Sequence, residues 1–411
     1  MVEGRSNVPS SAKAERGQES VQNKEHHMEL VWATEDFVIA GQPYPGFPIL
    51  LWDTMESCVP ANKFFRHYLL RGSIASRRSW PSIGRALYDF FSFIQAHELD
   101  WHDVERGEAK SLVAAYRDYC LIACHLAQNT THQRLQYVCK FYEFALKEGW
   151  LKRLPFAYEE RPIRRKSGLL THINASGGKV IANDVMLRKA KALPKFLSMA
   201  EAKALLAASD NPHHRMMMRL ALHTGLRREE ISAFPVTYAF DPDKAGRTER
   251  NLQIRLDPFD GSGMVTKGSK PRNIRISRHF MADLYRYVTK VRGERASLGK
   301  HAQSALFLNQ FGNPYGTDGK SLNRIINEAG KRAGIKVHTH MLRHTYATHT
   351  LASLQRNPAS GLEPLVYVQR QLGHSSIQTT MVYLHLVNEM ADEAVLAYDD
   401  ELNEFGGQSG G

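Results

Sequence analysis

The sequence has few cysteines, no long hydrophobic run and no secretory leader. Its four cysteines, at positions 58, 120, 124 and 139, form no CxxC pair, which argues against a disulfide scaffold. No apolar run approaches the ~20 residues that a membrane-spanning helix needs. The polar N-terminus, MVEGRSNVPSSAKAERGQES, also lacks the apolar segment of a secretory signal. We therefore expect a cytoplasmic protein that does not associate with membranes.

Acidic residues are scarce relative to basic ones. The chain has 54 Lys and Arg against 42 Asp and Glu, a formal net charge of +12, which indicates a polyanionic partner such as nucleic acid or an anionic membrane surface. The content of 43% hydrophobic and 23% charged residues is typical of globular proteins and excludes collagen, coiled coil and full-length disorder. A chain of 411 residues is too long for one ordinary core, so it predicts two domains.

Composition and periodicity divide the chain into five segments. We predict a polar, disordered tail at 1–28, a helical domain at 50–157, a basic linker at 158–196, a second domain at 197–390 and an acidic tail at 391–411. Helical spacing near 61–71, 81–94, 107–126 and 135–149 makes the first domain a bundle of about four helices. Overall the pattern predicts a mainly α protein.

The linker is strongly basic. Between 161 and 196 it holds nine Lys and Arg against one acid, Asp184. A solvated connector is one explanation, but a segment lying along a phosphate backbone accounts better for the sign of the charge.

The second domain is predicted to be mostly helical with a small antiparallel sheet. Ser198 and Glu201 have the spacing of a capping box, which predicts a helix start there. Three short alternating runs, at 252–256, 264–266 and 274–276, predict the strands, and a lysine stands in the hairpin turn between the last two. Further helices are predicted near 279–292, 320–334, 341–353, 363–372 and 376–397.

Four clusters of polar residues in this domain suggest chemistry. They are HTGLRREE around Arg227 and Glu230, TKGSKPR with Lys267, HMLRH with His340, Arg343 and His344, and LGHSSIQTTMVY with His374 and Tyr383. The spacing of HMLRH puts both histidines and the arginine on one helical face. Taken singly, each residue has an ordinary alternative, such as a surface charge or a packed tyrosine. The run HTHMLRHTYATH lacks the HExxH pattern and an acidic third ligand, so we expect no metal.

Together and in this order, the four motifs resemble the signature of the tyrosine recombinases, the phage integrase family. The resemblance covers most of 197–390, and 50–157 resembles the family's helical, SAM-like core-binding domain, which binds DNA. It implies a catalytic set of Arg227, Lys267, His340, Arg343, His374 and Tyr383. Glu230 corresponds to an acidic residue that supports the first arginine, and His344 is expected to support the site without acting as a catalyst.

The resemblance also implies a mechanism. Tyr383 would attack a DNA phosphate to give a 3′-phosphotyrosine, with two arginines on the phosphate oxygens and Lys267 protonating the 5′-oxygen. No metal, cofactor or ATP is expected. The implied partners are double-stranded DNA, DNA-bending accessory proteins and three further copies of the chain, joined as a tetramer on paired sites by exchange of the C-terminal helix. A type IB topoisomerase, an inactive DNA-binding regulator and a metal-dependent nuclease remain as alternatives.

Overall fold

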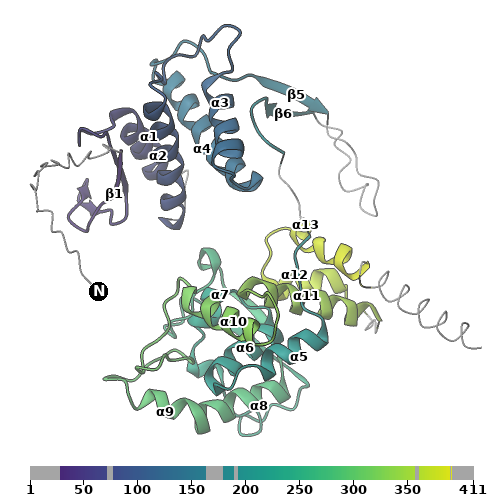
Figure 1. The fold of residues 1–411 in the computed structure, drawn as a ribbon. Coiled ribbons are helices and arrows are strands. Elements are labelled where there is room, and N and C mark those ends of the chain that lie inside the picture. Colours follow the sequence, from purple (N-terminus) through teal and green to yellow (C-terminus); the bar gives the residue numbers. More distant parts are fainter. Residues whose placement is uncertain are drawn as a thin grey trace, which may run out of the picture. The chain divides into compact units, whose positions relative to one another are not determined.

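A computed structural model describes residues 28–71, 77–162, 179–188, 193–356, 361–388 and 390. The chain forms two compact units, Met1–Lys191 and Ala192–Gly411, which are described separately here (Figure 1). The predictions for the polar tail before residue 28 and the acidic tail after residue 390 lie outside the described residues.

The first unit is built on helices packed through aromatic side chains. Its helices are α1 (Val59–Leu70), α2 (Trp80–Ala96), α3 (Leu112–Asp118) with the π-turn η2 (Tyr119–Ala123), and α4 (Gln128–Lys147). Helix α2 begins at Trp80, because Pro81 suits the first turn of a helix. Phe91 lies edge-on to Phe141 of α4, with ring centroids 5.2 Å apart. All four predicted helical stretches are helical in the structure.

Short strands precede this bundle. β1 (Glu29–Trp32) pairs antiparallel with β4 (Pro48–Leu51), and β2 (Val38–Ile39) pairs with β3 (Gln42–Pro43). The β1–β4 sheet packs closely on α2, because a Cβ added at Gly84 would lie 2.9 Å from Pro48 Cβ and 3.2 Å from Trp32 Cη2. The sequence had predicted no element for residues 29–49.

Part of the predicted linker folds with the first unit. β5 (Tyr158–Pro162) and β6 (Lys179–Asn183) form an antiparallel hairpin. Beyond it, Val185 is buried in the aromatic core, and His132 Nδ1 lies 2.7 Å from the backbone oxygen of Leu187. Residues 183–187 therefore pack with the first unit, partly against α4, and the domain limits given above stay predictions.

The second unit is mostly helical around one small sheet. Its helices are α5 (Met199–Ala207), α6 (Pro212–Thr224), α7 (Arg228–Ser232), α8 (Arg278–Tyr287), α9 (Gly293–Ala296), α10 (Lys320–Arg332), α11 (Thr339–Arg356), α12 (Pro364–Leu372) and α13 (Ile377–Thr380). Ser198 and Glu201 form the predicted capping box of α5. β7 (Asn251–Leu256) pairs antiparallel with β8 (Arg272–Ser277), and their alternate apolar residues face the core.

Two local predictions were wrong. The run 264–266 is not a strand; Met264 and Thr266 are buried in the β7–β8 connection, so their burial has a cause other than sheet pairing. The predicted helix at 376–397 is interrupted at Met381, where α13 ends and a second helical stretch, 382–388, begins. The mainly α fold class with a small antiparallel sheet is confirmed.

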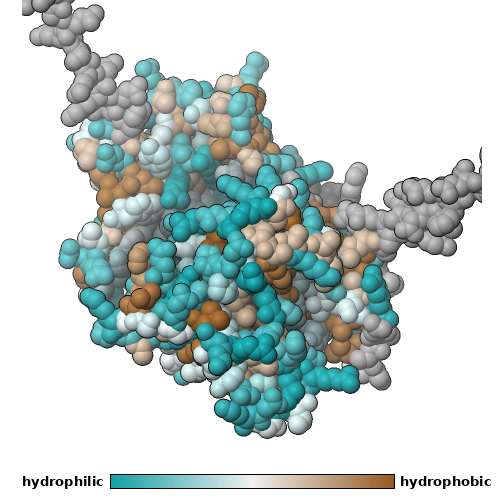
Figure 2. Space-filling model, turned by 60° about the horizontal axis from the view of Figure 1, so that its bottom comes forward, coloured by the Kyte–Doolittle hydropathy of each residue, from teal (hydrophilic) through white to brown (hydrophobic). Residues whose placement is uncertain are grey.

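Hydrophilic side chains cover most of the face shown in Figure 2, where hydrophobic side chains form only small patches. Among the described residues, no helix combines the length and the apolar character needed to cross a bilayer.

Candidate active site

Two glycines at helix ends shape the centre of the second unit. α6 stops at Gly225 and α12 stops at Gly373, both in the left-handed conformation, with φ of +63° and +65°. A Cβ at Gly225 would lie 2.5 Å from Tyr346 Cδ1. The turn after Gly225 presents Arg227, and the residue after Gly373 is His374. Both helix ends therefore direct polar side chains to one region.

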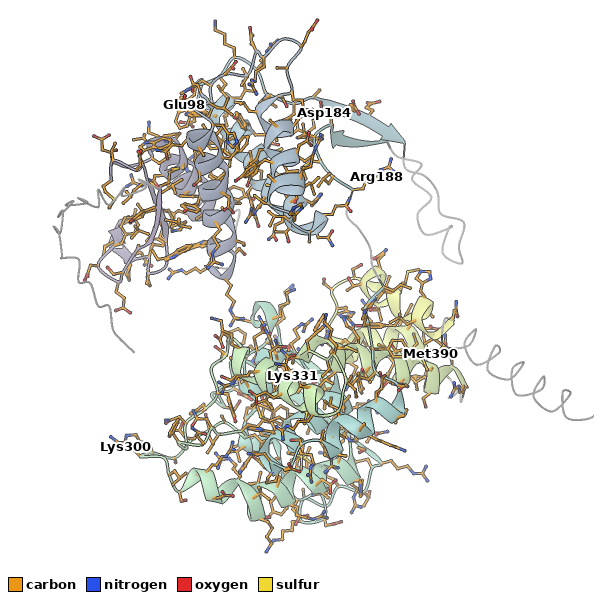
Figure 3. The ribbon with its side chains drawn as sticks, viewed as in Figure 1. Glu98, Asp184, Arg188, Lys300, Lys331 and Met390 are labelled. Atoms are coloured by element: carbon orange, nitrogen blue, oxygen red, sulfur yellow. The ribbon has the colours of Figure 1, made fainter. Side chains whose placement is uncertain are left out.

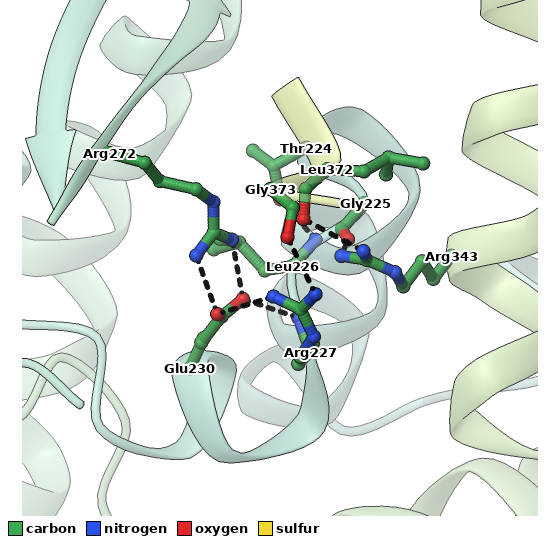
Figure 4. Close-up of polar contacts among 9 residues, drawn as sticks. All are labelled: Thr224, Gly225, Leu226, Arg227, Glu230, Arg272, Arg343, Leu372 and Gly373. Carbon is green, nitrogen blue, oxygen red and sulfur yellow. Dashed lines mark hydrogen bonds and ion pairs between the residues drawn. The ribbon is translucent and has the colours of Figure 1, made fainter. Parts of the chain in front are cut away.

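Arg343 is buried between these helix ends. Only 2% of this residue is exposed. Its Nη1 donates to the backbone oxygen of Gly225 at 2.6 Å and its Nη2 to that of Leu372 at 2.8 Å (Figure 4). Burial, followed by the nearby charge of Arg227, lowers the pKa of Arg343 to about 9. The guanidinium is held by carbonyl oxygens at the negative ends of two helices.

Glu230 is the acid that braces this region. It is 1% exposed, and its Oε1 and Oε2 accept from Nη1 and Nη2 of Arg272, both at 2.7 Å. Arg227 donates to the same carboxylate from Nη1 at 3.1 Å and from its backbone N–H at 2.8 Å. These donors hold the pKa of Glu230 below its usual range although burial opposes them. Sequence reasoning named Glu230 as a support but missed Arg272.

The site has more positive than negative charge. Arg227, whose side chain is 16% exposed, also donates from Nη2 to the backbone oxygen of Gly373 at 3.1 Å. Three guanidinium groups, those of Arg227, Arg272 and Arg343, thus surround one carboxylate (Figure 4). Because like charges held in a dry site repel, an anion placed between the arginines would be stabilised.

Tyr383 lies beside this charge and contacts His344. The tyrosine is 1% exposed, and its hydroxyl lies 2.9 Å from His344 Nδ1. Burial raises the pKa of Tyr383, whereas the charges of Arg343 and Arg227 lower it. The structure therefore places His344, which was expected only to support the site, directly on the hydroxyl group.

The other two histidines flank this pair. The rings of His374 and Tyr383 are stacked, with centroids 6.3 Å apart and planes 9° apart, and His374 Nδ1 lies 2.9 Å from Thr380 Oγ1. His340 is exposed, and its ring lies 4.4 Å from that of His344. Burial, followed mainly by neighbouring cationic groups, lowers the pKa of His344 and of His374 to about 3, so both are neutral near pH 7.

Lys267 is not in contact with the other site residues. It begins a short 3-10 turn, η4 (Lys267–Ser269), just before β8, and its side chain is exposed. Within the described part of the chain neither Lys267 nor the nearby Lys270 has a hydrogen bond or ion pair. The structure thus brings Arg227, Glu230, Arg343, His344, His374 and Tyr383 together, with the exposed His340 at the edge of this group beside His344, whereas Lys267 lies apart and exposed to solvent.

A basic hollow lies along α10, where Figure 3 labels Lys331. Its volume is about 620 Å³. Its lining residues are Lys320, Asn323, Arg324, Asn327, Glu328, Lys331, Ile335, Lys336, Val337 and His338. His338, two residues before His340 in the sequence, is one of these lining residues.

Among the described residues, no three or more His, Cys, Asp or Glu side chains are grouped in a way that could hold a metal ion.

Comparison with known proteins agrees with this site. Residues 195–390 match the phage integrase family, and these residues contain all four motifs and every residue of the cluster. Residues 195–390 are therefore a domain of the phage integrase family, the tyrosine recombinases, as the motifs predicted.

Relatives match beyond this domain. The chain is 27% identical over 281 residues to the tyrosine recombinase XerC of Bacillus pumilus, covering 66% of this chain and 75% of the relative. It is 27% identical over 326 residues to XerD of Caulobacter vibrioides, covering 77% and 88%.

Solved structures share the fold. A XerH site-specific recombinase bound to a palindromic difH substrate matches with a TM-score of 0.52 and 17% identity, over 82% of this chain and 83% of that one. The Tn1549 transposon integrase in complex with a circular intermediate DNA matches with a TM-score of 0.50 and 16% identity, over 79% and 94%.

Proposed function

We propose that this chain is a site-specific DNA recombinase that cuts and rejoins strands through a covalent tyrosine–DNA intermediate. The observation that carries the proposal is the excess of buried positive charge beside Tyr383. Arg227 and Arg343 are fixed by backbone oxygens and retain further N–H groups for a ligand. A phosphodiester is an anion whose oxygens match such planar donors.

Each step of the proposed reaction is assigned to particular residues. The oxygen of Tyr383 forms a bond to phosphorus, and its proton passes to His344 Nδ1, which is neutral and 2.9 Å away. The bond between phosphorus and the 5′-oxygen breaks, and Lys267 gives that oxygen its proton. Arg227 and Arg343 stabilise the charge on the non-bridging oxygens. A second strand's 5′-hydroxyl reverses these steps, so no ATP is needed.

His340 and His374 complete the proposed set as hydrogen-bond donors to the phosphate. His340 is exposed to solvent, so it can donate to an incoming phosphate from the open side of the site. His374 lies against Tyr383, so it can donate to a phosphate bound beside the nucleophile.

Double-stranded DNA is the proposed substrate. The hollow along α10 supports this, because it has four Lys and Arg against one acid, Glu328, in its lining, and counterion release from DNA favours such surfaces. We propose that four copies assemble on paired sites by exchanging the C-terminal helix, with DNA-bending proteins as accessories. Mass measurement on paired DNA sites tests the tetramer. Because the substrate is DNA, we also propose a cytoplasmic location.

Covalent capture tests the function. The substrate is a pool of duplexes of randomised sequence, each with a nick. After cleavage the fragment that carries the 5′-hydroxyl diffuses away, so a recombinase remains covalently joined to the DNA that it prefers. We expect wild type to form an adduct that survives denaturant and EDTA, and Tyr383→Phe to bind DNA without forming one. Absence of any wild-type adduct, or an adduct from Tyr383→Phe, would refute the proposal. Efficient relaxation of plasmids that lack the captured sequence would favour a topoisomerase.

A further inference from the structure

Arg272 joins two parts of the site that are far apart in sequence. It is the first residue of β8, and its side chain is 12% exposed. Both of its terminal nitrogens donate to Glu230, 42 residues earlier in the chain. Glu230 in turn holds Arg227. The fork is a two-point contact, so it fixes the direction of the Arg272 side chain as well as its position.

The stem of Arg272 is confined by Gly373. A Cβ added to this glycine would lie 2.6 Å from Arg272 Cδ and 2.9 Å from its Nε. The same Nε is buried and has no hydrogen-bond partner in the described residues. Close packing therefore holds the arginine between Gly373 and Glu230, at the cost of one unsatisfied donor.

The turn η4, which carries Lys267, lies between the buried Thr266 and the partly buried Arg272. Thr266, just before Lys267, is 6% exposed, and Arg272 follows Lys267 by five residues. Between them the chain turns sharply, because the backbone N–H of Ser269 donates to the oxygen of Thr266 at 3.1 Å. Gly268 and Ser269 both have positive φ, +69° and +52°. A short turn held at both ends has few positions in which to place Lys267.

We propose that Arg272 is a positioning residue for Lys267: its fork on Glu230 fixes the turn that delivers the lysine to the 5′-oxygen. This inference rests on the proposed function. A lysine at position 272 would keep the positive charge but could not reproduce the two-point contact. The Arg272→Lys variant therefore tests geometry while changing the field at the phosphate little.

The test compares two leaving groups on the captured duplex. One substrate has the ordinary 5′-oxygen at the cleavage position, and the other has sulfur there. An alkoxide needs a proton to leave, whereas a thiolate does not, since thiols ionise near pH ~8.5. Cleavage rates are measured for wild type, Lys267→Ala, Arg272→Lys and the double variant. Arg255→Lys is the matched control, because Arg255 lies on the neighbouring strand, is 65% exposed and pairs with Asp257 at the surface.

We expect Lys267→Ala to slow cleavage of the oxygen substrate by roughly 100–10,000-fold, the usual contribution of a general acid. Arg272→Lys should slow it by about 100-fold, the effect of an ångström of misplacement. On the sulfur substrate both variants should approach wild type. The double variant should be no slower than Lys267→Ala alone, because two residues that act as one unit are not additive. Arg255→Lys should match wild type on both substrates.

Three results would overturn the inference: an Arg272→Lys defect that persists with sulfur, a double variant whose defects multiply, or Arg272→Lys cleaving the oxygen substrate at the wild-type rate. The first result would mean that Arg272 acts on the phosphate, through Arg227, and does not position Lys267. If Arg272→Lys melts below the assay temperature, Arg272→Gln, which keeps one donor toward Glu230, takes its place. Wild type failing to cleave either substrate would instead refute the proposed function.

Discussion

Replacing Glu230 by glutamine removes the single negative charge from the arginine cluster while keeping the size of the side chain. Glutamine has one acceptor oxygen, and its amide nitrogen would face N–H groups that now donate to Oε1 or Oε2. Removing one partner of a buried ion pair costs about 3–5 kcal/mol. At 2–4 °C per kcal/mol for a domain of this size, we expect the melting temperature of the second unit to fall by roughly 6–20 °C.

Calorimetry of the full chain measures this change in melting temperature. The size of the change should also depend on pH. The pKa of Glu230 is lowered by folding, so its stabilising contribution is present above the pKa of an unfolded glutamate, ~4.3. That contribution is lost as the pH falls through the lowered folded value. The melting temperatures of wild type and Glu230→Gln should therefore differ at pH 7 and converge in acid. Inorganic phosphate should also narrow the difference at pH 7, because the variant has the larger excess of positive charge.

Glu249→Gln is the control, because Glu249 is exposed and pairs with Arg247 at the surface; its melting temperature should equal that of wild type. If Glu230→Gln also melts with wild type at pH 7, the carboxylate is not the counter-charge that the arginine cluster requires, and the electrostatic account of the site is wrong.

Three further predictions follow from the site. His344→Gln should slow adduct formation by roughly 100–10,000-fold, the range for a lost general base, with DNA binding unchanged in a gel shift; a rate near wild type would show that the contact with Tyr383 is only structural. The pKa of about 3 for His344 and His374 means that the unfolded chain, with histidines near ~6.5, binds more protons. Stability of the second unit should therefore fall as the pH drops from 6.5 toward 3, and a flat calorimetric profile would contradict buried neutral histidines. Gly225→Ala should destabilise by about 1–3 kcal/mol, because its Cβ would meet Tyr346; an unchanged melting temperature would show that the helix end can relax.

Local signals made part of the structure predictable. The capping box at Ser198 and Glu201 predicts the start of α5, and the glycine in HTGLR is a local signal of the same kind at the end of α6. Both depend on residues within one helical turn, so the sequence contains the whole cause. The structure brings most of the motif residues close together but leaves Lys267 apart, and their catalytic roles stay predictions.

The remaining features depend on tertiary contacts. Arg272 belongs to the motif TKGSKPR, but its pairing with a glutamate 42 residues earlier depends on where the tertiary fold places β8 relative to α7. His340 and His344 share a helical face, and only the packing of 382–388 selects His344 for the tyrosine. The strands before residue 52 were missed because two to four residues give too short a pattern to establish alternation.

Arg227 and Arg343 both donate to carbonyl oxygens of the main chain, although Arg227 also contacts Glu230. No substitution at Leu372 can delete the oxygen that Arg343 uses, whereas a substitution at Gly225 or Gly373 would move one. In a saturation-mutagenesis experiment, Gly225 and Gly373 should therefore accept no other residue, whereas Leu372 should accept other apolar residues. Randomising only the exposed basic residues of α10, Lys320, Arg324 and Lys331, should leave these carbonyl oxygens in place.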